Sequence, residues 1–131
     1  MEPYFAEPSY ETPKVVLDPQ NNQYELSGNS YPENSTKVFQ PILEWLDEFI
    51  AESPTDSMQI DFNLDYFNTS SAKYILEVLR KFRQYKDKGN AVHIRWHYFE
   101  DDTDMLEAGE DYMDTVSMEF ELIEKPDDDD F

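Results

Sequence analysis

The clearest pattern of hydrophobic and polar positions lies in residues 60–82, where a strand pattern leads through a polar turn into a helix pattern. Ile60, Phe62 and Leu64 alternate with polar residues, and this period of two predicts a strand with one face on a core. Beyond the turn, apolar residues recur at helical spacing, at Ala72, Ile75, Leu76, Leu79 and Phe82. The pattern predicts a central strand and helix around which the other elements pack.

Four polar residues form the turn between this strand and its helix, namely Asn68, Thr69, Ser70 and Ser71. Their side chains can accept hydrogen bonds from the free N–H groups of a first helical turn. A hydroxyl at this position is exposed, and it lies close to the positive end of the helix dipole. The residues alone leave two interpretations open, a simple helix cap and a hydroxyl presented for chemistry.

Two short strands and a helix are predicted before this unit. The strands cover residues 14–18 and 23–27, on either side of a turn-rich segment. A broad apolar stripe over residues 38–50 predicts the helix, with Ser35 as its candidate N-cap. Because proline lacks the amide hydrogen that a helix uses, Pro41 within this stripe predicts that the helix starts late or bends.

Three elements are predicted after the central unit: a strand at residues 91–98, a mostly solvated acidic helix within 100–114, and a last strand around 118–122. The resulting order is β-β-α-β-α-β-α-β. Such an alternation predicts an α/β sandwich with a mixed, mostly parallel sheet edged by antiparallel strands.

The elements outline one domain over residues 13–125. Residues 1–12 carry no sustained periodicity and are predicted to be an N-terminal arm that lies along the domain or stays mobile. Residues 126–131 are predicted to be an acidic, disordered tail.

Composition narrows the function classes. The 131 residues include 10 basic and 30 acidic ones, so the net charge of 10 − 30 = −20 disfavours binding to nucleic acid or anionic lipid. Charge alone leaves an acidic nucleic-acid mimic open. There is no cysteine for a disulfide or a thiolate site, and no apolar run approaches the roughly 20 residues of a membrane span. We therefore expect a cytoplasmic protein without a cofactor.

Paired carboxylates give an enzymatic alternative. Asp61 and Asp65 share one strand face near the reactive hydroxyls, and with His97 they would suit a small metal-dependent hydrolase or phosphotransferase. Solvated strand acids are the plainer interpretation in a chain this acidic. His93 and His97 are about 13 Å apart along a strand, too far to share one ion, and only 3 glycines are available for a phosphate-binding loop.

Three separated motifs carry a family resemblance: GNSYPENS at residues 28–35, NTSS at 68–71 and WHY at 96–98. The order of elements and the hydroxyl turn look like the STAS fold of anti-anti-sigma factors. More closely, the three motifs resemble the SiaC family of bacterial regulatory phosphoproteins over residues 13–123. The resemblance implies that Thr69 is the phosphorylation site.

The resemblance also implies the partners. They are a cognate Ser/Thr kinase with a histidine-kinase-like ATPase fold, a PP2C-type phosphatase and, in some members, a diguanylate cyclase bound by the unphosphorylated form. We therefore interpret the chain as a non-enzymatic phosphoprotein of a partner-switching pathway that controls biofilm formation and aggregation.

A partner-binding patch is predicted around Thr69. Because loops that follow parallel neighbouring strands emerge at the same sheet edge, the GNSYPENS and NTSS loops are expected to lie together. The candidate contact residues are Tyr31, Asn34, Asn68, Ser70, Ser71, Asp61 and Asp65.

Overall fold

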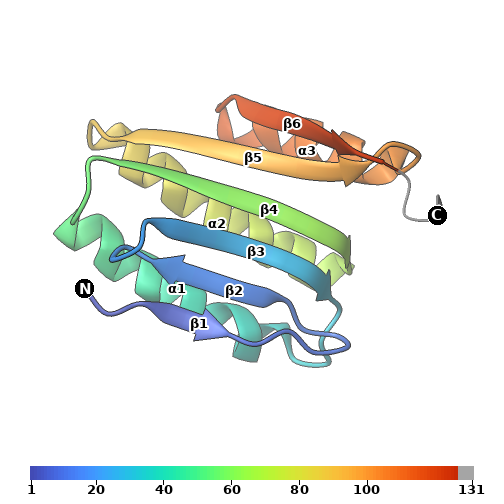
Figure 1. Cartoon of the computed structure of the whole chain (residues 1–131), viewed down its shortest axis with the longest axis horizontal. Helices are drawn as coiled ribbons and strands as arrows, with labels where there is room; N and C mark the ends of the chain where they lie inside the picture. Colours follow the sequence, from blue (N-terminus) through green and yellow to red (C-terminus); the bar gives the residue numbers. More distant parts are fainter. Residues whose placement is uncertain (127–131) are drawn as a thin grey trace.

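Three strand–helix–strand crossovers follow an N-terminal antiparallel meander in the computed structural model, which describes residues 1–126 (Figure 1). The strands are β1 (Tyr4–Ala6), β2 (Lys14–Asp18), β3 (Gln23–Ser30), β4 (Ser57–Phe67), β5 (Ala91–Phe99) and β6 (Phe120–Lys125). The helices are α1 (Ser35–Glu52), α2 (Thr69–Asp87) and α3 (Thr103–Val116).

The strands form one six-stranded sheet in the order β1-β2-β3-β4-β5-β6. The pairs β1–β2 and β2–β3 are antiparallel, and the three remaining pairs are parallel. Each crossover connects a strand to its next neighbour, always in the same direction across the sheet. Crossovers that share one handedness therefore place every helix on the same face of the sheet. Figure 1 shows α1, α2 and α3 together behind the sheet. The predicted mixed, mostly parallel α/β sandwich is confirmed.

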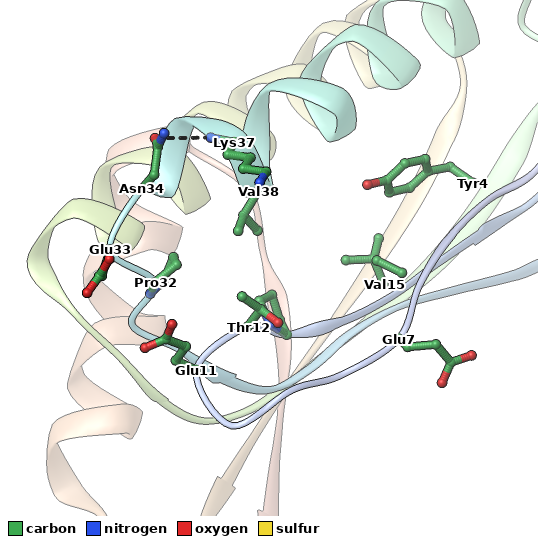
Figure 2. Close-up of a pocket in the computed structure, with 12 residues that line it drawn as sticks. Tyr4, Glu7, Glu11, Thr12, Val15, Pro32, Glu33, Asn34, Lys37 and Val38 are labelled. Carbon is green, nitrogen blue, oxygen red and sulfur yellow. Dashed lines mark hydrogen bonds between the residues drawn. The ribbon is translucent and has the colours of Figure 1, made fainter.

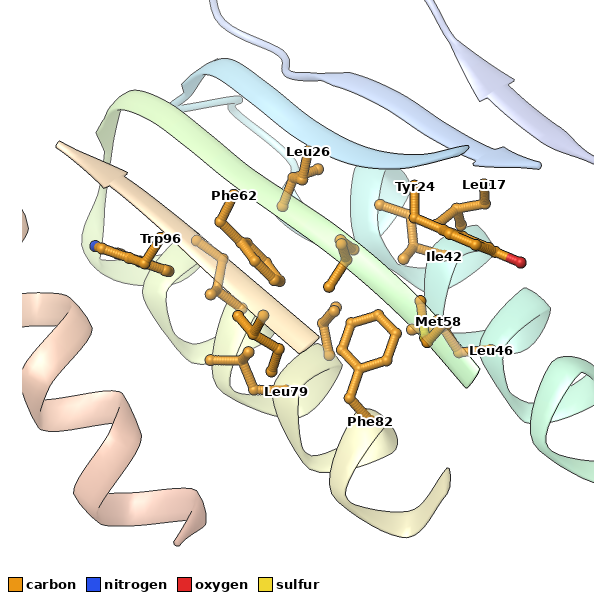
Figure 3. Packing of buried hydrophobic residues seen from close by; sticks show 14 of the residues in the cluster. Leu17, Tyr24, Leu26, Ile42, Leu46, Met58, Phe62, Leu79, Phe82 and Trp96 are labelled. Atoms are coloured by element: carbon orange, nitrogen blue, oxygen red, sulfur yellow. The ribbon is translucent and has the colours of Figure 1, made fainter. Parts of the chain in front are cut away.

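The core lies between the sheet and its helices. Phe62 of β4 and Trp96 of β5 stack at 5.6 Å between ring centroids, and the Phe82 ring of α2 meets Phe62 edge-on at 6.5 Å. Figure 3 shows these rings with Leu79 in the space between strands and helix. Phe62, Leu79, Phe82 and Trp96 are each exposed by 1% or less, which confirms the central strand and helix predicted from residues 60–82.

The opposite face of the sheet carries charged side chains in place of a second helix layer. Asp61 on β4 accepts hydrogen bonds from Arg95 (3.1 Å) and His97 (2.8 Å) on β5. Glu121 on β6 pairs with His93 (2.7 Å) and Arg95 (3.6 Å). Because solvent reaches this face, the acidic side chains and Arg95 can form ion pairs there without a large desolvation cost.

Helix α1 differs from its prediction in two respects. Its N-cap is Asn34, whose side chain accepts a hydrogen bond from the Lys37 amide at 3.3 Å, so Ser35 was wrong as the cap. The helix starts at Ser35 and contains Pro41, so the late start was also wrong. Proline in a helix interior removes a hydrogen bond, and burial of Phe39, Ile42, Trp45, Leu46 and Phe49 offsets that loss.

The N-terminal arm lies along the domain and contains a strand that the sequence pattern did not predict. In β1, Tyr4 pairs with Leu17 and Ala6 with Val15. The Trp45 indole N–H also donates to the Glu2 carbonyl at 2.9 Å. A strand of three residues is too short to show a periodicity of its own.

An acidic tail was predicted for residues 126–131. All of these residues except Pro126 lie outside the part of the chain that the structure describes. Within residues 1–126, no helix has the length and apolar character needed to cross a membrane.

Candidate functional site

Thr69 is the first residue of α2, two residues beyond the end of β4. Asn68 precedes it in an extended conformation and caps the helix, with its side-chain oxygen accepting a hydrogen bond from the Ser71 amide at 2.9 Å. The Thr69 side chain is exposed. Capping and hydroxyl presentation thus fall to two different residues, and Thr69 is left free of the capping role.

The NTSS turn is tied to the loop that follows β3. The Asn68 amide donates to the Ser30 carbonyl at 2.9 Å, and the Ser30 and Ser71 hydroxyls are 2.8 Å apart. The Ser35 hydroxyl is 2.6 Å from that of Ser70. The N-termini of α1 and α2 therefore lie side by side at one sheet edge, as predicted from the parallel pairing of β3 and β4.

The predicted contact residues divide by accessibility. Asn34, Thr69 and Ser70 are exposed and Asn68 is half-buried, so they form an accessible surface that we call the hydroxyl patch. Ser71 has 0% of its surface exposed. A partner at this edge cannot reach Ser71 in this structure, and its role is to support the turn from inside through Ser30.

Tyrosine rings extend the accessible surface beside the hydroxyl patch. Tyr31 follows β3, and its amide donates to the Glu11 carbonyl at 2.9 Å. Its ring meets Tyr66 edge-on at 6.0 Å. Desolvation raises the pKa of Tyr31, and the nearby Tyr10 and Glu11 raise it further. We call Tyr10, Tyr31 and Tyr66 the tyrosine row.

The sequence pattern did not identify Tyr66 as part of this edge, because a register shift occurs there. Leu64 pairs with Gly28 and Tyr66 pairs with Asn29, so Asp65 is an extra residue on β4. The shift turns Phe67 toward the core, where its ring meets Trp96 at 6.3 Å. The only sequence signal was that the alternation of β4 ends at Asp65.

Electrostatics at the helix starts favour an anion. The first turns of α1 and α2 contain no acidic residue, although the chain has 30 of them. By contrast, α3 has Asp102 as its cap and Asp104 in its first turn. Acidic side chains ordinarily compensate the positive end of a helix. In the first turns of α1 and α2 that compensation is missing, and the start of α2, which carries Thr69, can stabilise an added anion.

Of the three residues of the hydrolase alternative, Asp61 and His97 come together and Asp65 lies apart. Asp61 meets His97, but Arg95 completes an ion-pair network around them on the open sheet face. Asp65 lies four residues further along β4, about 13 Å away. In residues 1–126 no group of three or more His, Cys, Asp or Glu side chains could hold a metal ion. Asp61 is also six residues from the end of β4, about 20 Å from the hydroxyl patch along the strand.

Comparison with solved structures finds the same fold in two crystal structures from Pseudomonas aeruginosa. The crystal structure of apo-SiaC matches with a TM-score of 0.83 and 29% identity, over 94% of this chain and 99% of that one. The crystal structure of the diguanylate cyclase SiaD in complex with its activator SiaC matches with a TM-score of 0.85 and 28% identity, over 93% of this chain and 99% of the matched chain.

Sequence comparison agrees with the structural match. An uncharacterized protein of Pseudomonas aeruginosa strain UCBPP-PA14 is 31% identical over 111 residues, which span 85% of this chain and 87% of that protein. The family model of the SiaC family regulatory phosphoproteins matches residues 6–125. With the three motifs and the fold in agreement, the chain belongs to the SiaC family.

Proposed function

We propose that this protein is the phosphoswitch of a bacterial partner-switching pathway and that Thr69 is its switch residue. The observation that carries the proposal is the exposed Thr69 side chain at the start of α2, next to a capping residue that frees it. The neighbouring start of α1 and the lack of acidic residues in both first turns support it.

The fold is expected to tolerate phosphate at this position. Phosphorylation adds about −1.5 to −2 charges and three acceptor oxygens. At an exposed helix N-terminus the dipole favours an anion by about 0.3–1 kcal/mol. The modification therefore changes what can bind at the hydroxyl patch without unfolding the domain.

The effector that we propose is a diguanylate cyclase, bound by the unphosphorylated form in control of biofilm formation and aggregation. The support is the complex of the related SiaC with the cyclase SiaD. An effector that covers the hydroxyl patch would have to bury a dianion once Thr69 is phosphorylated. A penalty of about 2.7 kcal/mol already weakens binding by about a hundredfold.

Two enzymes complete the proposed cycle, and the chain itself acts as their substrate. A Ser/Thr kinase with a histidine-kinase-like ATPase fold adds the phosphate, and a PP2C-type phosphatase removes it. The family resemblance of the NTSS turn is the support for both enzymes. Their shared requirement is an accessible Thr69 side chain, which the turn provides.

The test is phosphorylation of Thr69→Ala by the cognate kinase with MgATP, read by intact-mass measurement. We expect no added phosphate on this variant and a thermal unfolding midpoint close to that of the wild type, because the side chain is exposed. Ser70→Ala is the matched control from the same turn and should still accept phosphate. Undiminished phosphate on Thr69→Ala would move the site to Ser70.

A further inference from the structure

A second feature of the same edge is a cavity of about 440 Å³ between the β1–β2 connection and the start of α1. Val15 and Val38 form its apolar floor with Tyr4, and Figure 2 shows these three side chains directed toward a common space. Val15 is 2% exposed and belongs to the core, whereas Val38 and Tyr4 are half-buried against it. We call this cavity the arm pocket.

The rim of the arm pocket is acidic. Glu7, Glu11 and Glu33 line it together with Lys37, a net charge of 1 − 3 = −2. The rim thus has the same sign as the whole chain, which carries −20. An apolar floor with an acidic rim is complementary to an apolar side chain that has a basic residue beside it.

The arm pocket is continuous with the hydroxyl patch. Asn34 lines the pocket and caps α1, and the next residue, Ser35, meets Ser70 at 2.6 Å. On its other side, Glu11 accepts the hydrogen bond from Tyr31 of the tyrosine row. A partner seated over Thr69 therefore has the pocket within reach.

The tyrosine row supplies the second kind of contact that interfaces use. Among residues 1–126 the exposed large hydrophobic side chains are Phe5, Tyr10 and Tyr66, at 58%, 88% and 55%. Two of these three belong to the tyrosine row. Aromatic side chains are enriched among the residues that dominate binding energy, and exposed ones gathered at one edge mark an interaction site.

We propose that the arm pocket is the anchor site of the effector: a segment of the bound cyclase inserts an apolar side chain into it and places Lys or Arg against the acidic rim. This inference rests on the proposed function, since it extends the surface around Thr69. It adds a site that phosphorylation does not modify. The hydroxyl patch then reports the phosphorylation state, and the arm pocket provides affinity and partner choice.

The first experiment measures binding of the purified diguanylate cyclase of the source organism by calorimetry. Val38→Phe fills the pocket, Glu33→Lys reverses rim charge, and Tyr10→Ala removes an exposed ring. We expect each to weaken binding by about tenfold or more, with the Glu33→Lys loss shrinking at high salt. Glu52→Lys, the same charge change at the far end of α1, should stay within about twofold.

Failure of the pocket and failure of the switch give different results. If the three variants bind as the wild type does while phosphorylation still abolishes binding, the pocket inference is wrong and the switch stands. If phosphorylated and unmodified forms bind equally, the switch is wrong, and the variants still decide the pocket. Because Val38→Phe could perturb α1, its unfolding midpoint is measured, and if it is lowered the exposed Glu33 position decides the pocket alone, since Tyr10 belongs to the tyrosine row and does not line the pocket.

A second experiment tests the chemistry without the cyclase. Amide shifts of the whole chain are followed by NMR during titration with a short peptide that alternates Leu and Arg. Matched peptides replace Leu by Ser or Arg by Glu. We expect shifts centred on Val15, Asn34 and Val38 with the first peptide alone. Shifts elsewhere, or equal shifts with all three peptides, would overturn the inference.

Discussion

Asn68 and Thr69 divide two tasks that adjacent polar residues at a helix start could share. The Asn68 side chain satisfies the Ser71 amide, so the helix start is stable whatever Thr69 carries. The Thr69 hydroxyl is exposed and needs no structural partner. Because of this division, we expect that modification or substitution of Thr69 leaves the stability of the domain unchanged.

A first prediction at this scale is that Thr69→Asp imitates the phosphorylated form only in part. Aspartate brings one negative charge and two acceptor oxygens, whereas phosphothreonine brings nearly two charges and three oxygens. The affinity for the cyclase should therefore lie between those of the unmodified and phosphorylated proteins. Calorimetry of the three forms checks this, and equal affinity of the unmodified and phosphorylated forms would rule out the switch.

Tyr24 and Tyr85 form a natural pair for a second prediction. In residues 1–126, the Tyr24 hydroxyl is the one buried side-chain polar atom without a hydrogen-bond partner. The Tyr85 hydroxyl donates to the Thr55 carbonyl at 2.7 Å. Tyr24→Phe should raise the free energy of unfolding by up to about 1 kcal/mol, and Tyr85→Phe should lower it by about 1–2 kcal/mol. Urea unfolding measures the free energy of unfolding of both variants. Equal effects of the two substitutions would contradict the difference in hydrogen bonding between the two hydroxyls.

The same tyrosine gives a pH dependence. Burial raises the pKa of Tyr24 to about 12, with further contributions from Tyr85 and Asp18. The unfolded chain releases this proton near pH 10, so it binds fewer protons than the folded chain between pH 10 and 12. Stability should therefore fall as the pH rises through that interval. Over this interval Tyr24→Phe should lose less stability than the wild type. Part of the pH dependence should remain in this variant, because burial also raises the pKa of Tyr112.

At the scale of elements, α3 docks on the sheet through a residue without a side chain. A Cβ at Gly109 would lie 2.6 Å from Cδ1 and 2.7 Å from Nε1 of Trp96. The Trp96 indole N–H also donates to the Met105 carbonyl at 2.9 Å. The tryptophan of the WHY motif thus holds α3 against the sheet, near the edge strand β6.

Gly109→Ala should destabilise the protein. Alanine gains about 1 kcal/mol over glycine in a helix interior, but overpacking against a buried ring costs about 1–3 kcal/mol. We expect a net loss of about 1 kcal/mol in the free energy of unfolding, together with a change in Trp fluorescence. Glu110→Ala, at the exposed next position, should stay within about 0.5 kcal/mol. A Gly109→Ala variant more stable than the wild type would contradict the close contact.

At the scale of the whole molecule, the single-handed crossovers put the helices on one face and the functional loops at one edge. The starts of α1 and α2 meet there, and the hydroxyl patch, tyrosine row and arm pocket follow one another along it. The ion-paired open face of the sheet lies apart from this surface. We therefore expect the proposed kinase and effector to bind at this one surface.

Shared use of this edge predicts competition. Saturating cyclase should slow the phosphorylation of Thr69 by the kinase, because both partners must cover the same hydroxyl patch. Initial rates with increasing cyclase, measured on the wild type and on Glu52→Lys as a control, test this. If the rate is unchanged at saturation, the two partners use different surfaces.

Much of the fold was predictable because its signals are local. The alternation in β4 and β5 and the helical stripe of α2 each lie within consecutive residues, and the hydrophobic effect acts on that periodicity. The polar turn with Thr69 follows from its place between two such patterns. The sequence pattern missed strand β1 because that strand is only three residues long. It misplaced the cap of α1 because two neighbouring polar residues, Asn34 and Ser35, could both serve as the N-cap.

The sequence by itself determined the order of elements from β2 onward, the faces of the central strand and the position of Thr69 at a helix start. Only the tertiary structure decided which distant residues meet. Ser35 and Ser70 are in contact across 35 positions, Asp61 pairs with His97 rather than acting with Asp65, and Glu11 lies beside Tyr31. The physical reason is that periodicity specifies which side of a strand or helix is buried, whereas strand order and register determine which exposed residues become neighbours.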